Sequence, residues 1–355
     1  MARGYFLDTI AAMQGYVPGE QINDPGVIKL NSNENPYPPS PKVLAAITTA
    51  ASAGLRRYPE PASDTLRAAA ARVYGVDVDQ VIAGNGSDEL LSMLMRCFVG
   101  PSDRVAYATP TYSLYDTLVE IQGGTKATVR YRDDFAIPPA LGRQRAAVTF
   151  LCNPNAPSGT LVSPAAIARL ARTVRGILVV DEAYIDFADV GAASCIPLVQ
   201  RYDNVIVLRT FSKSFSLAGL RIGLAFASRQ LVDGMMKVKD SYNLNRVSAV
   251  AATAALGDLA WMTRNARRIQ RSRGRLTTAL ERLGFHVYPS QTNFVLARRA
   301  NTDMRRIQRE LKAQRILIRH FDVPGLTDCL RISIGTPDET TTVVAALKGA
   351  LRVGA

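Results

Sequence analysis

The segment Thr210-Phe211-Ser212-Lys213-Ser214-Phe215-Ser216-Leu217-Ala218-Gly219-Leu220-Arg221 joins two short apolar runs and places a lysine between them. These runs, Val205–Arg209 and Ile222–Ala227, have the length and composition of buried strands. They are the last two of seven such runs between residues 81 and 227, which alternate with helical patterns. This alternation predicts an α/β domain built on a mostly parallel, seven-stranded sheet.

The rest of the chain divides around this predicted sheet. The seven predicted strands are Val81–Ala83, Arg104–Ala108, Ala127–Tyr131, Ala147–Cys152, Ile177–Val180, Val205–Arg209 and Ile222–Ala227. Beyond residue 256, basic amphipathic helices and short alternating segments predict a smaller α+β domain. The proline-rich beginning is typical of an extended arm. We therefore expect an N-terminal arm over residues 1–30 that joins the small domain or a dimer partner, a large domain over 31–255 and a small domain over 256–355.

Composition indicates a globular protein of the cytoplasm. The chain has 355 residues, of which 47% are hydrophobic, and its mean hydropathy is +0.02. No apolar run approaches the length of a membrane span, and the first residues do not have the pattern of a signal peptide. The four cysteines are widely spaced, which predicts free thiols in a reducing compartment. With only two histidines, neither a metal site nor a Ser-His-Asp triad is expected.

The net charge of +13 raises the alternative of a nucleic-acid-binding protein. Six of the arginines lie between residues 264 and 275, where apolar residues keep helical spacing. This pattern favours a packed helix with a solvated basic face over a phosphate-binding surface. The charge alternative also leaves the polar segments at the strand ends unexplained.

Several polar segments begin where a predicted strand stops. Gly84–Asp88 follows the first strand, Asn153–Gly159 the fourth, Asp181 the fifth and Thr210–Lys213 the sixth. Ligands of open α/β sheets bind beyond the carboxyl ends of the strands. These four segments are therefore expected to form one site.

Lys213 and Asp181 together suggest the chemistry of pyridoxal phosphate (PLP). Lys213 lies between Phe211 and Phe215, and desolvation there would lower its pKa and free a nucleophilic amine for an imine with a phosphorylated aldehyde. A carboxylate such as Asp181, facing a pyridine nitrogen, keeps that nitrogen protonated, so the ring accepts carbanion electrons. Taken alone, Asp181 is equally consistent with an ordinary capping carboxylate.

The turn after the first strand suits a single phosphate. Gly84–Asp88 opens a helix, and backbone N–H groups and the helix dipole favour an anion there. A dinucleotide fingerprint, as in a nicotinamide dehydrogenase, would need a glycine at Glu89, and a merely structural turn is the other alternative. Downstream donors for the same phosphate are Thr210, Ser212 and Arg221.

With these motifs, the chain resembles the fold-type I PLP-dependent aminotransferases, and within them it is most similar to the histidinol-phosphate aminotransferases. The resemblance covers nearly the whole chain. The segments that carry it are Gly15–Gly19, Leu30–Pro36, Arg57–Pro59, Gly84–Asp88, Asn153–Gly159, Asp181–Tyr184, Thr210–Arg221 and Leu330–Gly335.

The resemblance implies a role for each residue of the cofactor site. Lys213 forms the imine with PLP and moves a proton between the substrate carbon and the cofactor, while Asp181 holds the pyridine nitrogen. Tyr184 meets the ring hydroxyl and Tyr112 covers the ring. The phosphate is bound by Gly86, Ser87, Asp88, Thr210, Ser212 and Arg221, joined by Tyr58 of a second subunit, which implies a homodimer.

The substrate site and reaction follow from the same resemblance. Arg331 would grip the phosphate of histidinol phosphate in one half-reaction and a carboxylate of glutamate or 2-oxoglutarate in the other, assisted by Arg319 and Tyr16. An aromatic amino-acid aminotransferase acting on phenylalanine or tyrosine is the nearest alternative. A PLP decarboxylase of a phosphorylated amino acid is a more distant one.

One position departs from the family pattern. The family commonly has an asparagine where this chain has Ala156, whose methyl group cannot bond the ring hydroxyl, and Asn155 is the expected substitute. Ser158 replaces the usual threonine and keeps the hydroxyl.

Overall fold

The computed structural model describes residues 4–16, 19–22 and 24–352 of the chain. Its large domain contains a seven-stranded sheet, and all seven predicted strands are present. In sheet order the strands are β2 (Val81–Gly84), β8 (Gly223–Phe226), β7 (Val205–Thr210), β6 (Ile177–Asp181), β5 (Val148–Cys152), β3 (Arg104–Thr109) and β4 (Thr125–Arg130). Only β8 runs antiparallel to its neighbours, which confirms the mostly parallel sheet.

Helices cover both faces of this sheet, which explains why its central strands are apolar throughout. Alternate residues of β6 belong to different cores: Val179 packs in one cluster, while Leu178 and Val180 pack in the other. The first cluster includes α4 (Ser87–Phe98), α5 (Leu114–Gln122) and α7 (Arg229–Val238). The second includes α3 (Asp64–Tyr74), α6 (Pro164–Thr173) and α8 (Arg246–Leu256), and α2 (Pro41–Ser52) packs on α8.

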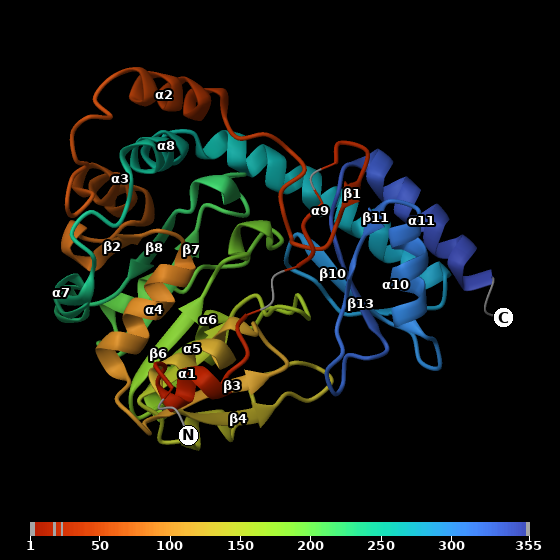
Figure 1. Cartoon of the computed structure of the whole chain (residues 1–355), viewed down its shortest axis with the longest axis horizontal. Helices are drawn as coiled ribbons and strands as arrows, with labels where there is room; N and C mark the ends of the chain where they lie inside the picture. Colours follow the sequence, from red (N-terminus) through yellow and green to blue (C-terminus); the bar gives the residue numbers. More distant parts are fainter. Residues whose placement is uncertain (1–3, 17–18, 23, 353–355) are drawn as a thin grey trace.

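The small domain is built on an antiparallel sheet. Its strands, in order, are β12 (Arg319–His320), β13 (Cys329–Ser333), β10 (Phe294–Arg298) and β9 (His286–Val287). The helices of this part are α10 (Met304–Ala313) and α11 (Pro337–Arg352), together with α9 (Leu259–Arg282), which runs from the large domain to the small one in Figure 1.

The first thirty residues contact both domains. The short helix α1 (Asp8–Ala12) packs near α5 of the large domain. Farther along, β1 (Ile28–Lys29) pairs in parallel with β11 (Ile316–Leu317) of the small domain. The segment that follows β1 therefore enters the space between the two domains (Figure 1).

The basic stretch of residues 264–275 lies in α9 and is mostly a solvated face. Ile269 and Leu276 are buried, whereas Arg267 and Arg271 are exposed, as the spacing predicts. Arg273 differs, because it turns inward and pairs with Asp189. Among the described residues, no helix is long and apolar enough to cross a membrane, and no group of three or more metal-binding side chains is found.

Candidate active site

The carboxyl ends of neighbouring strands bring the predicted chemical groups to one edge of the large sheet. Asp181 is the last residue of β6, and Lys213 follows β7, which pairs with β6 in parallel. β2 points the same way as β7, because β8 runs antiparallel to both. The amino end of α4, which follows β2, therefore lies at this edge, where Asp88 pairs with Arg221 at 3.0 Å.

Asp181 is a buried carboxylate with uncharged partners. One of its oxygens accepts a hydrogen bond from the Tyr115 hydroxyl and the other from the Ala183 backbone N–H, both at 3.1 Å. Burial raises the pKa of Asp181 to about 6, although these two bonds oppose the rise. No cation pairs with this carboxylate in the described part of the chain, so a cationic ring nitrogen would supply the missing partner.

Lys213 is half-buried and carries an unusually acidic ammonium group. Burial lowers the pKa of Lys213 to about 8, and the nearby guanidinium of Arg331 acts in the same direction. Its Nζ donates to the carbonyl oxygen of Ser32 at 3.3 Å and lies 5.8 Å from the centre of the Tyr184 ring. Within the described ranges it forms no ion pair, so a substantial fraction of the amine is neutral near pH 8.

The backbone around Lys213 is held from two sides. Asn35 donates its side-chain amide to the carbonyl oxygens of Lys213 at 3.0 Å and Ser214 at 3.3 Å. The Ser214 hydroxyl donates to Asp186 at 2.5 Å. These bonds fix the chain on which the amine is mounted.

The predicted phosphate residues form a cradle at the amino end of α4. Gly86 has a φ of +85°, and a Cβ atom there would lie 2.7 Å from a nitrogen of Arg221, so glycine is required. Arg221 donates to the hydroxyl of Ser212 at 3.2 Å, and Thr210 donates to the same oxygen at 3.1 Å. Hydroxyls, a guanidinium and free helix N–H groups thus converge at one point, as an anion requires.

The carboxylate of Asp88 holds two other residues of the site. It accepts hydrogen bonds from Arg221 at 3.0 Å and from the Tyr112 hydroxyl at 3.2 Å. A carboxylate repels a phosphate, so only the backbone N–H of Asp88 is suited to bind that anion. The ring of Tyr112 also meets the Tyr16 ring edge-on, with centroids 6.3 Å apart.

Tyr184 is buried and is bonded by a residue that the sequence analysis did not assign. Asn33 donates its side-chain amide to the Tyr184 hydroxyl at 3.0 Å. Burial raises the pKa of the Tyr184 hydroxyl well above its usual value. Asn33 belongs to the Leu30–Pro36 motif, and that motif was the signal available in the sequence.

The structure holds Asn155 between its own loop and the segment that follows β3. Its amide nitrogen donates to the Ser158 hydroxyl at 2.9 Å and to the Pro110 carbonyl at 3.3 Å, and its oxygen accepts from Thr111 at 2.9 Å. Both amide hydrogens of Asn155 are therefore committed to these two segments. Ala156 is buried beside it and offers only a methyl group.

Two guanidinium groups without carboxylate partners line the side of the small domain. Arg331 donates to the Asn31 carbonyl oxygen at 2.9 Å, but its buried Nε has no hydrogen-bond partner among the described residues. Arg319 is paired with Arg331 across β12 and β13. The described part of the chain supplies no carboxylate to either group, so both cations are available to an external anion.

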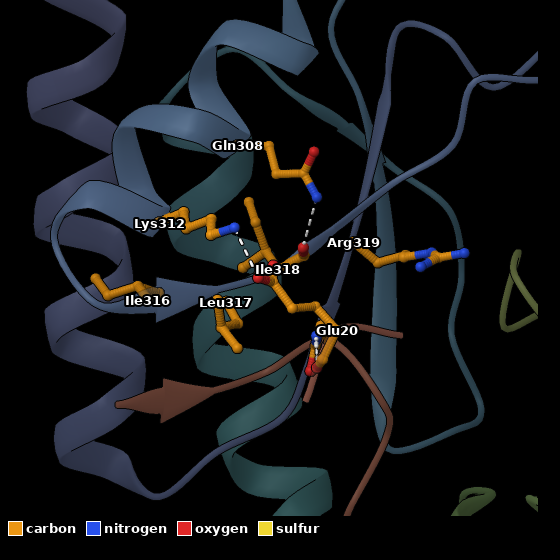
Figure 2. Close-up of a pocket in the computed structure, with 8 residues that line it drawn as sticks. Glu20, Gln308, Lys312, Ile316, Leu317, Ile318 and Arg319 are labelled. Carbon is orange, nitrogen blue, oxygen red and sulfur yellow. Dashed lines mark hydrogen bonds and ion pairs between the residues drawn. The ribbon is translucent and has the colours of Figure 1, made fainter. Parts of the chain in front are cut away.

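A small cavity is lined by Arg319 together with residues of α10, β11 and the first segment (Figure 2). Within it, Lys312 pairs with Glu20 at 2.7 Å, and Gln308 donates to the Ile318 carbonyl oxygen at 3.1 Å. The Arg319 side chain points away from both groups (Figure 2). Burial lowers the pKa of Arg331, and the charge of Arg319 acts in the same direction, so the two cations lie within electrostatic reach of each other.

One predicted residue, Tyr58, is not brought to the site by contacts within this chain. Tyr58 lies on the surface, 77% exposed, with its ring stacked on Tyr242 at 4.4 Å. In the Gly15–Gly19 motif, Val17 and Pro18 lie outside the described residues.

Comparison with known proteins identifies close relatives over the full length. Residues 25–347 match the family described as aminotransferase class I and II. The chain is 45% identical to histidinol-phosphate aminotransferase 1 of Trichormus variabilis, over 98% of this chain and 99% of the relative. It is 46% identical to histidinol-phosphate aminotransferase of Citrifermentans bemidjiense, over 96% and 97%. The crystal structure of histidinol-phosphate aminotransferase from Sinorhizobium meliloti in complex with pyridoxal-5'-phosphate has a TM-score of 0.91 and 30% identity, covering 100% of this chain and 99% of that one.

Proposed function

This chain belongs to the aminotransferase class I and II family, and we propose that it transfers the amino group between histidinol phosphate and 2-oxoglutarate. It is a PLP-dependent aminotransferase, and its relatives named for histidinol phosphate are similar over nearly their whole length. The observation that carries the substrate assignment is Arg331. Its guanidinium has a buried, unpartnered Nε beside the lysine of the site, as an anionic substrate requires.

The residues of the site fit PLP. Asp181 has the place and the raised pKa of a partner for the pyridine nitrogen, and Tyr184 and Tyr112 suit the ring hydroxyl and the ring face. The phosphate would be held by Gly86, Ser87, the backbone of Asp88, Thr210, Ser212 and Arg221. When bound, the cofactor supplies an electron sink for the carbanion that forms when the substrate loses a proton.

Lys213 is the residue that moves this proton. Since the pKa of Lys213 is lowered to about 8, a useful fraction of its Nζ is neutral and able to accept a proton from the substrate carbon. The bond from Nζ to the Ser32 carbonyl and the anchored backbone at Asn35 hold the amine in place between transfers.

Arg331 and Arg319 serve both half-reactions. A planar guanidinium pairs with a phosphate or with a carboxylate through two parallel hydrogen bonds, so one pocket accepts both anions. The rings of Phe294 and Phe321 lie 5.3 and 5.5 Å from the Arg331 guanidinium and cover part of its surface. This partial shielding from water strengthens the attraction to the anion.

The assembly and location belong to the same proposal. We expect a homodimer in which Tyr58 contributes to the phosphate site of the partner, and the exposure of Tyr58 supports this. The four free cysteines favour the cytoplasm. We also propose that the chain is divided into an arm over 1–30, a large domain over 31–255 and a small domain over 256–355. Sedimentation of the purified protein should show a dimer. Tyr58→Ala should weaken cofactor binding, and the variant should remain a dimer.

A spectroscopic and a kinetic experiment test the function. The purified protein should show a visible absorbance that borohydride bleaches, and Lys213→Ala should lack it. With 2-oxoglutarate as acceptor, kcat/KM for histidinol phosphate should exceed that for phenylalanine by at least about 100-fold, because a phosphate brings more negative charge to Arg331 and Arg319 than the carboxylate of phenylalanine does. A preference for phenylalanine would instead identify an aromatic amino-acid aminotransferase, and release of carbon dioxide would identify a decarboxylase.

A further inference from the structure

Asn33 and Ser333 lie 300 positions apart in the sequence and form a closed pair of hydrogen bonds beside Tyr184. The Asn33 backbone N–H donates to the Ser333 hydroxyl oxygen at 2.9 Å. The Ser333 hydroxyl donates in turn to the side-chain oxygen of Asn33 at 3.0 Å. Both residues are buried, and Asn293 also donates to the Asn33 carbonyl oxygen at 2.9 Å.

This pair fixes which end of the Asn33 amide faces Tyr184. A backbone N–H can only donate, so the single hydrogen of the Ser333 hydroxyl is free to go to Asn33. The amide oxygen accepts from Ser333 and the amide nitrogen donates to Tyr184 at 3.0 Å, because in the reverse orientation the Ser333 hydrogen would have no acceptor among the described residues. Because that nitrogen is only a donor, the Tyr184 oxygen accepts in this bond and its own hydrogen points elsewhere.

The Tyr184 hydrogen has no acceptor among the described residues, since the bond from Asn33 is the one hydrogen bond that its oxygen makes with them. The titratable groups that face Tyr184 are Arg331, Lys213, Asp181, Cys152 and Tyr112. Burial outweighs the opposing effect of Arg331 on the pKa of Tyr184, so the hydroxyl keeps its hydrogen at neutral pH.

We propose that Asn33 and Ser333 are positioning residues that aim the Tyr184 hydroxyl hydrogen at the ring hydroxyl oxygen of the cofactor. The inference rests on the proposed function, because that oxygen belongs to PLP. It matters more in this chain than in relatives with an asparagine at position 156, since Ala156 supplies no donor. Ser333 of the small domain and Asn33 of the segment after β1 thereby orient the hydroxyl hydrogen of Tyr184 in the large domain.

The electronic consequence is measurable without any substrate. A hydrogen bond donated to the ring oxygen stabilises its anionic form, so the bound chromophore should lose its proton at a lower pH. Without Asn33, the Tyr184 hydrogen is free to turn away. The chromophore pKa should then rise by about one unit, a tenfold change in its acid constant.

The experiment is a pH titration of the visible absorbance of the full chain with its cofactor bound. We expect Asn33→Ala to raise the chromophore pKa, and Ser333→Ala to raise it less, because the amide then turns between two orientations. Tyr184→Phe should give the largest rise. In the Tyr184→Phe background, Asn33→Ala and Ser333→Ala should add nothing, because both act through that hydroxyl.

The control is Asn265→Ala, which removes a comparably buried amide of α9 away from the site, one that donates to the Pro38 carbonyl oxygen at 3.2 Å. It should leave the chromophore pKa unchanged. An unchanged pKa in both Asn33→Ala and Ser333→Ala, or equal shifts with and without the Tyr184 hydroxyl, would overturn the inference. If Asn33→Ala does not fold, the inference is tested by titrating Ser333→Ala in the parent and in the Tyr184→Phe background. A parent protein without a visible, pH-dependent band would instead refute the proposed function.

Discussion

Two groups of buried charges lie close together in this protein. The charges of one group have oppositely charged partners within the described part of the chain, and those of the other do not. In the paired group, Arg209 forms ion pairs with Asp186 and, at 3.7 Å, with Glu182. In the unpaired group, Lys213 and Arg331 have no carboxylate partner among the described residues, and Asp181 has no cation. The adjacent residues Asp181 and Glu182 belong to different groups.

The charges of the paired group stabilise the fold, whereas those of the unpaired group are available to bind a ligand. Burial raises the pKa of Glu182, but Arg209 and the bonds that Glu182 accepts from Ser194 at 2.6 Å and the Cys195 backbone at 2.5 Å oppose this rise from within the chain. Uncompensated burial in the other group appears as shifted pKa values, to about 8 for Lys213 and about 6 for Asp181. The paired group supports the unpaired one, because Asp186 also anchors Ser214 beside Lys213.

The largest expected effect is the loss of catalysis on removing Lys213. Lys213→Met should lower kcat by at least about 10⁴-fold, since it removes both the nucleophile and the group that carries the proton. Steady-state assays with histidinol phosphate would measure it. The matched control is Lys237→Met on the exposed side of α7, which should retain full activity. A Lys213→Met protein with more than a hundredth of the parent kcat would contradict the assignment.

The second effect tests the paired group by the same kind of substitution. Arg209→Met should lower the free energy of unfolding by about 3–5 kcal/mol, because Glu182 and Asp186 are left buried without their cation. Urea unfolding followed by circular dichroism would measure it. Adding Glu182→Gln and Asp186→Asn should restore part of the loss. If Arg209→Met is as stable as the parent, the ion pairs of Arg209 do not stabilise the fold.

The third effect has the opposite sign. In the cofactor-free protein at pH 7, Lys213→Met should increase the free energy of unfolding by about 1–3 kcal/mol, because it removes a charge that is buried at a cost. The pKa of Lys213 is about 8 in the folded chain and 10.5 in the unfolded chain, so the unfolded chain binds more protons between these values. The contribution of Lys213 to parent stability should therefore rise between pH 8 and 10.5, which the difference between parent and Lys213→Met isolates from other titrating groups.

Urea unfolding at several pH values checks this sign. Below pH 8 the contribution of Lys213 is constant, because both states bind the proton. The rise above pH 8 should disappear in Lys213→Met, since the group that titrates is gone. A Lys213→Met protein that is less stable than the parent at pH 7 would place Lys213 in the paired group and end the contrast.

The sequence was sufficient for the elements and for the residues that follow strand ends. Apolar runs predict the seven strands, and the positions of Asp181 and Lys213 after neighbouring parallel strands predict that both lie at one edge of the sheet. Contacts that join distant segments were not predictable, because no local pattern marks them. The bonds of Asn33 with Ser333 and Tyr184 are of this kind, as is the inward turn of Arg273 toward Asp189.

The smallest expected effect adds a polar group to the unpaired region. Ala156→Asn should lower the pKa of the bound chromophore by less than about one unit, because it adds a second donor near the ring hydroxyl oxygen. Ala156→Val is the control, since it adds bulk at this buried position without a donor. If both variants shift the chromophore pKa equally, packing is the cause. If neither shifts it, another group already supplies that donor, and the Tyr184 hydroxyl is not the sole donor to the ring oxygen.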